Sequence, residues 1–175
     1  PASGGGVRNA GTFEADRSAI VRNSAPRAGG GVEAVAGSST TISRSTLSDN
    51  STGPGPGNGG GLHLTGTGTV VVDRTVVTGN RAASEGGGLW NSGTGTMTVD
   101  RSTIAHNRAS GAEATNGGGG LFQEAGPSGK LTVTRSEVTG NVADGAAGSG
   151  GGLFNDQGTL VVERTVVRGN SAARA

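Results

Sequence analysis

The stretch from Gly86 to Ala109 reads GGGLWNSGTGTMTVDRSTIAHNRA, and the rest of the chain repeats its pattern. Each copy opens with glycines, continues with a short apolar or aromatic run, and closes at an asparagine. Six copies of roughly 25–34 residues fill residues 1–175. They start near Gly4, Gly29, Gly59, Gly86, Gly118 and Gly150. Repetition at such a period indicates a solenoid, so we expect one domain of six coils across residues 1–175.

The composition favours a thin solenoid over a compact globule. The chain has 37 glycines, and only 2% of its residues are aromatic. So much glycine would suggest disorder, but the apolar residues recur periodically, which argues against it. A solenoid interior is one side chain deep, so small aliphatic residues are enough to fill it.

Charge and cysteine content exclude several classes of partner and site. Fourteen basic residues against thirteen acidic ones give no electrostatic signature of nucleic-acid binding. There is no cysteine for disulfides or thiolate metal sites. The sequence has no apolar run of about 18 residues, so we expect no membrane insertion. The chain starts at Pro1, which suggests a processed product or an excised fragment. We expect a secreted protein with a processed N-terminus, located outside the cell or on its surface.

Two polar positions are occupied identically in all six copies and always lie six residues apart. The first is an arginine: Arg17, Arg44, Arg74, Arg101, Arg135 and Arg164. The second is an asparagine: Asn23, Asn50, Asn80, Asn107, Asn141 and Asn170. Every length change falls elsewhere, so these positions mark the corners of the repeat.

Three short strands are expected in each copy: one after the glycines, one before the arginine and one after it. The residues before the arginine alternate apolar and polar, as in Val70 and Val72, which is a strand pattern. Equivalent strands of successive copies would pair in parallel. We therefore predict an all-β parallel β-helix of six coils with three sheets, about 29 Å long at about 4.8 Å per coil.

The repeat, written GGG[LV]-x-N…T-h-x-V-x-[RS]-S-x-[VI]-x-x-N-x-A, resembles the right-handed parallel β-helix repeats of bacterial surface proteins. It is similar to the GG-[AIL] and F-x-x-N repeats of polymorphic outer-membrane autotransporter passengers. The resemblance covers nearly the whole chain and implies a right-handed helix. Its functional implication is broad, because such proteins include adhesins, surface-layer components and polysaccharide lyases.

The two polar columns have structural and functional interpretations. We expect the asparagines to form a structural ladder of side-chain amides at a turn, with a row of exposed ligands as the alternative. The arginines would repel one another, but Asp16, Asp73, Asp100 and Glu163 each precede one of them. A solvated, charge-compensated corner is the favoured interpretation. A positive stripe that binds an acidic polysaccharide is the alternative.

A third column follows the first-strand aliphatic residue and should point outward. It contains Arg8 and Glu33 and then four ring-bearing residues, His63, Trp90, Phe122 and Phe154. Exposed aromatic rows bind sugars or partner proteins, whereas loops folded over them would make a satellite cluster. We therefore consider this column a possible partner or glycan face.

Catalysis has little support in the sequence. A lyase of β-helix type needs clustered carboxylates for Ca²⁺ and a neighbouring base. Here the acidic residues are spread along the coils, and Lys130 is the single lysine. His63 and His106 occupy different repeat positions. We expect no catalytic residues, no metal and no cofactor.

The end coils suggest a function. Solenoids generally need caps, because an end coil exposes apolar side chains and strand edges. The apolar residues expected at the two ends are Val7, Phe13, Ile20, Leu153, Leu160, Val162 and Val167. Because both ends share one repeat geometry, copies could stack head to tail into a filament. We predict a structural fibre subunit whose partners are copies of itself; the alternative is a fragment of a longer β-helical adhesin or glycan-binding protein.

Overall fold

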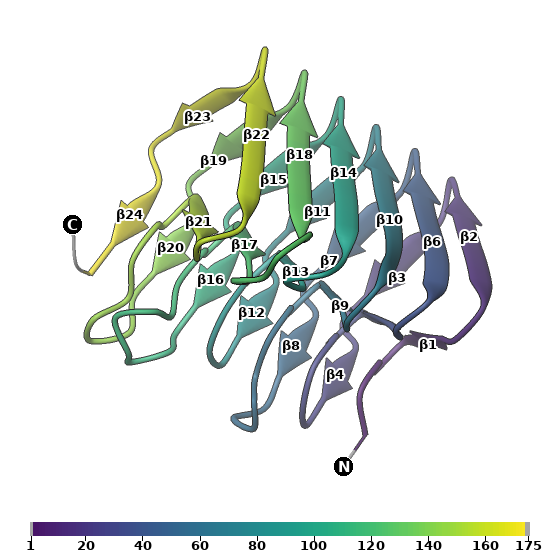
Figure 1. The fold of residues 1–175 in the computed structure, drawn as a ribbon, viewed down its shortest axis with the longest axis horizontal. Helices are drawn as coiled ribbons and strands as arrows, with labels where there is room; N and C mark the ends of the chain where they lie inside the picture. Colours follow the sequence, from purple (N-terminus) through teal and green to yellow (C-terminus); the bar gives the residue numbers. More distant parts are fainter. Residues whose placement is uncertain (1, 174–175) are drawn as a thin grey trace.

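The computed structural model describes residues 2–173 and contains β-strands joined by turns and loops. The chain winds through six coils, which lie side by side along the long axis of the molecule (Figure 1). Every strand pairs in parallel with its equivalent in the neighbouring coil. The prediction of a six-coil parallel β-helix is confirmed.

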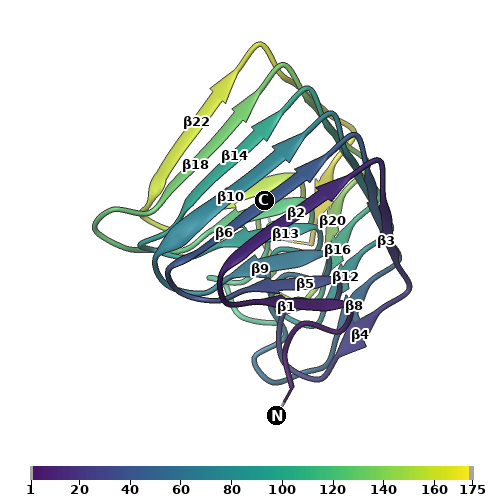
Figure 2. The same ribbon diagram turned by 90° about the vertical axis from the view of Figure 1, so that its right-hand side faces the viewer.

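The first sheet contains the strand that follows each glycine corner: β1 (Val7–Asn9), β5 (Val32–Ala34), β9 (Leu62–Leu64), β13 (Leu89–Asn91), β17 (Leu121–Gln123) and β21 (Leu153–Asn155). The second sheet has the longest strands: β2 (Thr12–Asp16), β6 (Ser38–Ser43), β10 (Gly68–Asp73), β14 (Thr96–Asp100), β18 (Lys130–Thr134) and β22 (Thr159–Glu163). Seen from the end of the helix, the six strands of the second sheet lie next to one another along one side (Figure 2).

The third sheet follows the arginine: β3 (Ala19–Val21), β7 (Thr46–Ser48), β11 (Val76–Thr78), β15 (Thr103–Ala105), β19 (Glu137–Thr139) and β23 (Val166–Arg168). A fourth sheet follows the asparagine: β4 (Ser24–Ala25), β8 (Ser51–Thr52), β12 (Arg81–Ala82), β16 (Arg108–Ala109), β20 (Val142–Ala143) and β24 (Ser171–Ala172). The prediction of three strands per coil was therefore wrong by one strand. Two residues are too few to show alternation, and the only sequence signal is the small residue two places after the asparagine.

The core is a set of aliphatic columns inside the coils. Leu62, Leu89 and Leu121 from the first sheet are completely buried. Val72 and Val99 from the second sheet are also completely buried. Alternate residues of each strand point inward, and the parallel register places like residues directly above one another, as in Leu89 beside Leu121. Every interior side chain therefore packs on its own equivalents in the adjoining coils.

The glycine corner needs glycine for two different reasons. The first glycine of each triplet has a positive φ, for example +61° at Gly86, which side chains with a Cβ rarely adopt. The second glycine has little space around it. A Cβ on Gly87 would collide with the carbonyl oxygens of Gly119 and Arg108. This corner is therefore crowded by backbone atoms of both the same coil and the next one.

Candidate functional site

The asparagine column forms a continuous hydrogen-bonded ladder between the third and fourth sheets. Asn107 Oδ1 accepts from the backbone N–H of Asn80 at 3.0 Å and from its Nδ2 at 2.9 Å. Asn107 Nδ2 in turn donates to Asn141 Oδ1 at 3.0 Å and to the carbonyl of Val77 at 2.9 Å. These asparagines are 0% exposed in coils two to five. The column therefore lies inside the helix and is not an exposed row of ligands.

The left-handed residue at this turn comes one position before the asparagine. Arg22, Asp49 and His106 have φ between 54° and 55°, and the equivalent position is glycine in the other three coils. The side chains of Asp49 and His106 each lie over a glycine of the next coil. A Cβ on Gly79 would meet Asp49, and one on Gly140 would meet His106. The turn thus combines a left-handed residue with an asparagine whose side chain makes hydrogen bonds to backbone N–H and carbonyl groups.

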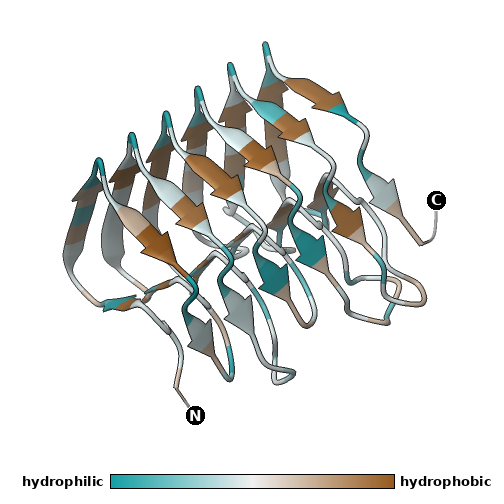
Figure 3. Cartoon of the chain, turned by 180° about the vertical axis from the view of Figure 1, so that it is seen from behind, coloured by the Kyte–Doolittle hydropathy of each residue, from teal (hydrophilic) through white to brown (hydrophobic). Residues whose placement is uncertain are grey.

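All six corner arginines adopt the left-handed conformation, with φ from 45° at Arg101 to 51° at Arg164. Left-handed backbone costs a residue with a Cβ about 1–2 kcal/mol, so this conformation is held by its surroundings. The Arg44 N–H, for example, donates to the carbonyl of Asp73 at 3.0 Å. Sequence reasoning missed this strain, because arginine gives no signal of positive φ. In Figure 3 the corners form a row of hydrophilic tips between the second and third sheets.

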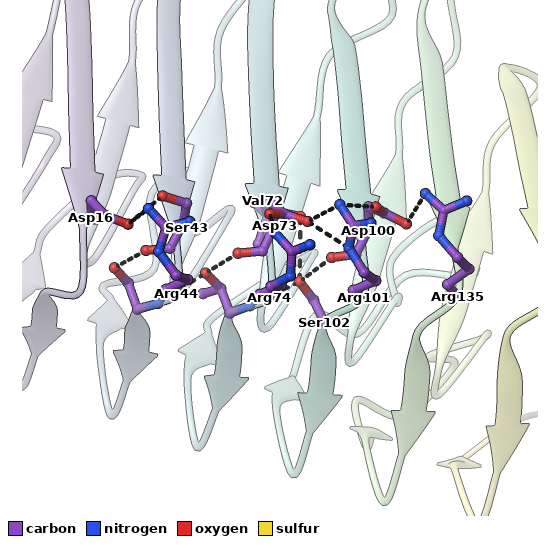
Figure 4. Close-up of polar contacts among 12 residues, drawn as sticks. Asp16, Ser43, Arg44, Val72, Asp73, Arg74, Asp100, Arg101, Ser102 and Arg135 are labelled. Carbon is purple, nitrogen blue, oxygen red and sulfur yellow. Dashed lines mark hydrogen bonds and ion pairs between the residues drawn. The ribbon is translucent and has the colours of Figure 1, made fainter.

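Ion pairs between coils compensate the charge of three of these arginines (Figure 4). Each pair joins an acidic residue to the arginine of the next coil along the axis. The three such pairs are Asp16–Arg44 at 2.5 Å, Asp73–Arg101 at 2.9 Å and Asp100–Arg135 at 2.7 Å. This arrangement agrees with a charge-compensated corner and disfavours an uninterrupted positive stripe.

The same contacts shift the acid–base equilibria at the corner. Hydrogen bonds from Arg44 and then Ser43 lower the pKa of Asp16. The pKa of Asp100 is likewise lowered, chiefly by its hydrogen bond from Arg135, with desolvation opposing the shift. Both carboxyl groups therefore stay ionised at pH values below their ordinary range.

The aromatic column is a stack of nearly parallel rings on the outer side of the first sheet. The ring centroids are 4.2 Å apart for His63 and Trp90, 6.1 Å for Trp90 and Phe122, and 5.1 Å for Phe122 and Phe154. His63, Trp90 and Phe122 are only 7%, 5% and 2% exposed, whereas Phe154 in coil six is half-buried. Of the two interpretations of this column, burial of these three residues favours cover by loops over an open row, and the ring of Phe154 in coil six is the most accessible of the four.

Loops cover the centre of the stack. Trp90 Nε1 donates to Glu85 Oε2 at 3.0 Å, and Asn116 Nδ2 donates to Glu85 Oε1 at 2.7 Å. Burial raises the pKa of Glu85, and the hydrogen bonds from Trp90 and Asn116 partly offset this effect. The sequence alone could not identify the residues of this cover, because Glu85 and Asn116 are 31 residues apart, on the loops that end two successive coils.

The other end of the stack is polar. His63 Nδ1 lies 3.1 Å from Glu33 Oε2, and Thr65 Oγ1 donates to Glu33 Oε1 at 2.5 Å. Glu33 and His63 are both buried. His106 lies at the asparagine corner and is exposed, so the two histidines are on different faces. The described residues contain no cluster of three or more acidic, histidine or cysteine side chains able to hold a metal ion, and they form no pocket.

The two end coils expose apolar residues whose equivalents are interior in the middle coils. Val162 and Val167 in coil six are 41% and 48% exposed, although their equivalents Val133 and Val138 are 0% exposed. Leu153 and Leu160 are partly buried there, as are Val7 and Phe13 in coil one. Ile20 departs from expectation, because it is only 8% exposed. The open apolar surface is therefore larger at coil six.

Comparison with known families agrees with this architecture. Residues 3–172 match the family model described as a right-handed β-helix region. The chain belongs to the right-handed β-helix family. No curated protein and no solved structure matches this β-helix. In its described part, no helix is long and apolar enough to cross a membrane.

Proposed function

We propose that this β-helix is a structural protein whose copies stack head to tail into a filament outside the cell or on its surface. The observation that carries the proposal is that the end coils leave strand edges unpaired and apolar side chains exposed. The strands of coil one and of coil six each have a partner on one side only, and coil six exposes side chains that are interior in every middle coil. A further coil would cover both the strand edges and the apolar surface.

The open ends have complementary hydrogen-bonding groups. Throughout the helix, a backbone N–H of the asparagine column donates to Oδ1 of the next asparagine, as Asn141 does to Asn170 at 2.9 Å. Coil six therefore ends in the N–H of Asn170, a donor, and coil one begins with Oδ1 of Asn23, an acceptor. The hydroxyl residues that directly follow the corner arginines repeat this relation, because the Ser18 N–H donates to Ser45 Oγ at 3.0 Å.

The apolar columns also match across such a junction. Continuing the register of the second sheet places Leu160 against Phe13 and Val162 against Ala15 of the next copy, as Leu131 lies against Leu160 within the chain. In the third sheet, Val167 would cover Ile20. The junction would bury apolar surface and close four parallel sheets at once, which favours stacking.

A longer β-helical adhesin that contains this segment is the second candidate, because additional coils of one chain would use the same edges. Glycan binding on the aromatic column is less favoured, since His63, Trp90 and Phe122 are buried. Alanine at Trp90, Phe122 and Phe154 tests that function: sugar binding should be lost while any polymer persists.

Electron microscopy of the purified, unrefolded protein tests stacking. We expect unbranched fibres with an axial repeat of about 29 Å, from six coils at about 4.8 Å each. Discrete short rods would contradict the proposal, and one longer rod containing the segment would favour the second candidate.

The matched variants are Val7→Asp with Val167→Asp at the end coils, and Val71→Asp with Val76→Asp on the outer faces of coil three. Val71 and Val76 are 38% and 42% exposed, so the second pair adds the same charge away from the junction. Circular dichroism would check that both variants fold. Fibres should disappear only with the end-coil pair; their persistence in that variant would refute stacking through the ends.

A further inference from the structure

We propose that the junction between copies is fixed in one register and one polarity by a charged clasp, in which Arg17 of one copy bridges Asp16 of the same copy and Glu163 of the preceding copy. This inference rests on the proposed function, because it specifies how one copy recognises the next. Its basis is a cluster of four charged side chains that already exists between two coils of the chain.

That cluster joins coils three and four. Arg101 contacts Asp73 of the preceding coil at 2.9 Å and Asp100 of its own coil at 2.9 Å. Arg74 contacts Asp73 at 2.8 Å. One arginine therefore lies between two carboxylates that face each other in the register of the second sheet, and a second arginine flanks them. The like charges of the two aspartates are compensated by the arginines.

The ends of the chain contain the same four residue types, divided between coil six and coil one. Glu163 and Arg164 occupy the positions of Asp73 and Arg74, and Asp16 and Arg17 occupy the positions of Asp100 and Arg101. Continuing the register of β22 onto β2 would bring the two halves together. The acidic residue lies in the coil that comes first, as in the three pairs between coils at the corner arginines.

Both halves of the clasp are available for contact. Arg17 and Glu163 are exposed and form no ion pair with any other residue among 2–173. Arg17 has a φ of 47°, close to the 45° of Arg101, so its side chain leaves the corner from the same backbone conformation. Forming the clasp therefore needs no rearrangement of the backbone at the corner.

The outer column of the first sheet adds a second contact. Within the chain, Arg8 lies beside Glu33 of coil two on one side, and Phe154 of coil six lies beside Phe122. If the same register continued into the next copy, Phe154 would lie beside Arg8 of that copy. Phe154 is stacked on Phe122 on one side and is half-buried, and Arg8 is exposed. A guanidinium over the open face of this ring would make a cation–π contact and continue the column across the junction.

The clasp also determines the polarity of stacking. Two coil-six faces placed together would provide Glu163 but no Arg17, and two coil-one faces would provide Arg17 but no Glu163, so neither arrangement can form the clasp. The N–H of Asn170, a donor, would also lack the Oδ1 acceptor of Asn23 in the first arrangement. Head-to-tail contact is the arrangement that pairs opposite charges, and such heterologous contacts extend without closing.

A charge exchange tests the clasp. Arg17→Glu alone and Glu163→Arg alone should each raise the critical concentration for assembly roughly tenfold, and the double exchange should restore it. Arg74→Glu is the matched control, because Arg74 occupies the same corner of coil three with a φ of 46°. It carries the same backbone strain and charge change but lies away from the junction. Sedimentation velocity and electron microscopy would measure assembly, and circular dichroism would verify folding.

The outcomes separate the clasp from stacking itself. If the unaltered protein assembles but the single exchanges behave like Arg74→Glu, the clasp is wrong and the proposed function stands. If the single exchanges weaken assembly and the double exchange does not restore it, Arg17 and Glu163 do not pair and the clasp is also wrong. If the unaltered protein does not assemble, the proposed function fails and the clasp fails with it.

Discussion

Replacing Asn107 by alanine should remove the centre of the asparagine ladder. Its side chain makes four hydrogen bonds at a site that is 0% exposed: two accepted from Asn80, one donated to Val77 and one donated to Asn141. Without it, the backbone N–H of Asn80 has no acceptor and no access to water. An orphaned buried group costs about 1–3 kcal/mol, and each other lost bond adds about 0.5–1.5 kcal/mol. The expected loss of unfolding free energy is about 2.5–7.5 kcal/mol.

Asn23→Ala is the matched control, because Asn23 begins the same ladder. Its Nδ2 makes one bond, to Asn50 Oδ1 at 3.0 Å, and that oxygen still accepts from the Asn23 N–H after the change. No buried donor is orphaned, so the expected cost is about 0.5–1.5 kcal/mol.

Urea unfolding followed by circular dichroism would measure both variants, at a dilution where sedimentation shows monomers. Equal slopes with urea concentration would indicate that a similar surface is exposed on unfolding. Equal costs for the two variants would refute the reasoning, because the ladder would then be a set of independent bonds whose burial does not matter.

Three further predictions concern the corners and the covered stack. Gly87→Ala should destabilise the protein by at least the ~1–3 kcal/mol typical of overpacking, because its Cβ meets backbone oxygens, whereas Gly11→Ala, with open space around it, should be nearly neutral in urea unfolding. Glu85 has a raised pKa in the folded protein, so the stability linked to its protonated form is lost as pH rises through that pKa. Glu85→Gln should abolish this decline in thermal unfolding measured across pH, and Glu113→Gln on an exposed loop should leave it in place. Asp100 has a lowered pKa, so its stabilising contribution is present above its ordinary pKa and is lost as pH falls through the lowered one. Asp100→Asn should therefore flatten the loss of stability in acid titrations, and an unchanged acid profile would contradict the role of its pairs with Arg101 and Arg135.

The candidate site was only partly predictable from the columns. Identical occupancy at Asn107 and its equivalents correctly placed the asparagines at a turn, because a backbone requirement recurs in every coil. The aspartates before the arginines indicated charge compensation, but not that each acid pairs with the arginine of the following coil. The sequence also predicted that Trp90 points outward, but it left open whether loops bury the ring.

The sequence by itself determined the number of coils, the parallel register and the aliphatic columns of the interior. These features follow from local periodicity, since each strand alternates over two residues and each copy repeats the pattern of the one before it. The tertiary structure decided the fourth sheet, the left-handed backbone of Arg101 and its equivalents, and the cover over Trp90 by Glu85 and Asn116. The physical reason is that these features depend on how the backbone closes each corner and on contacts between coils that lie far apart in sequence. A repeat pattern specifies which residues are equivalent, but only the folded chain brings a loop of one coil onto the side chain of another.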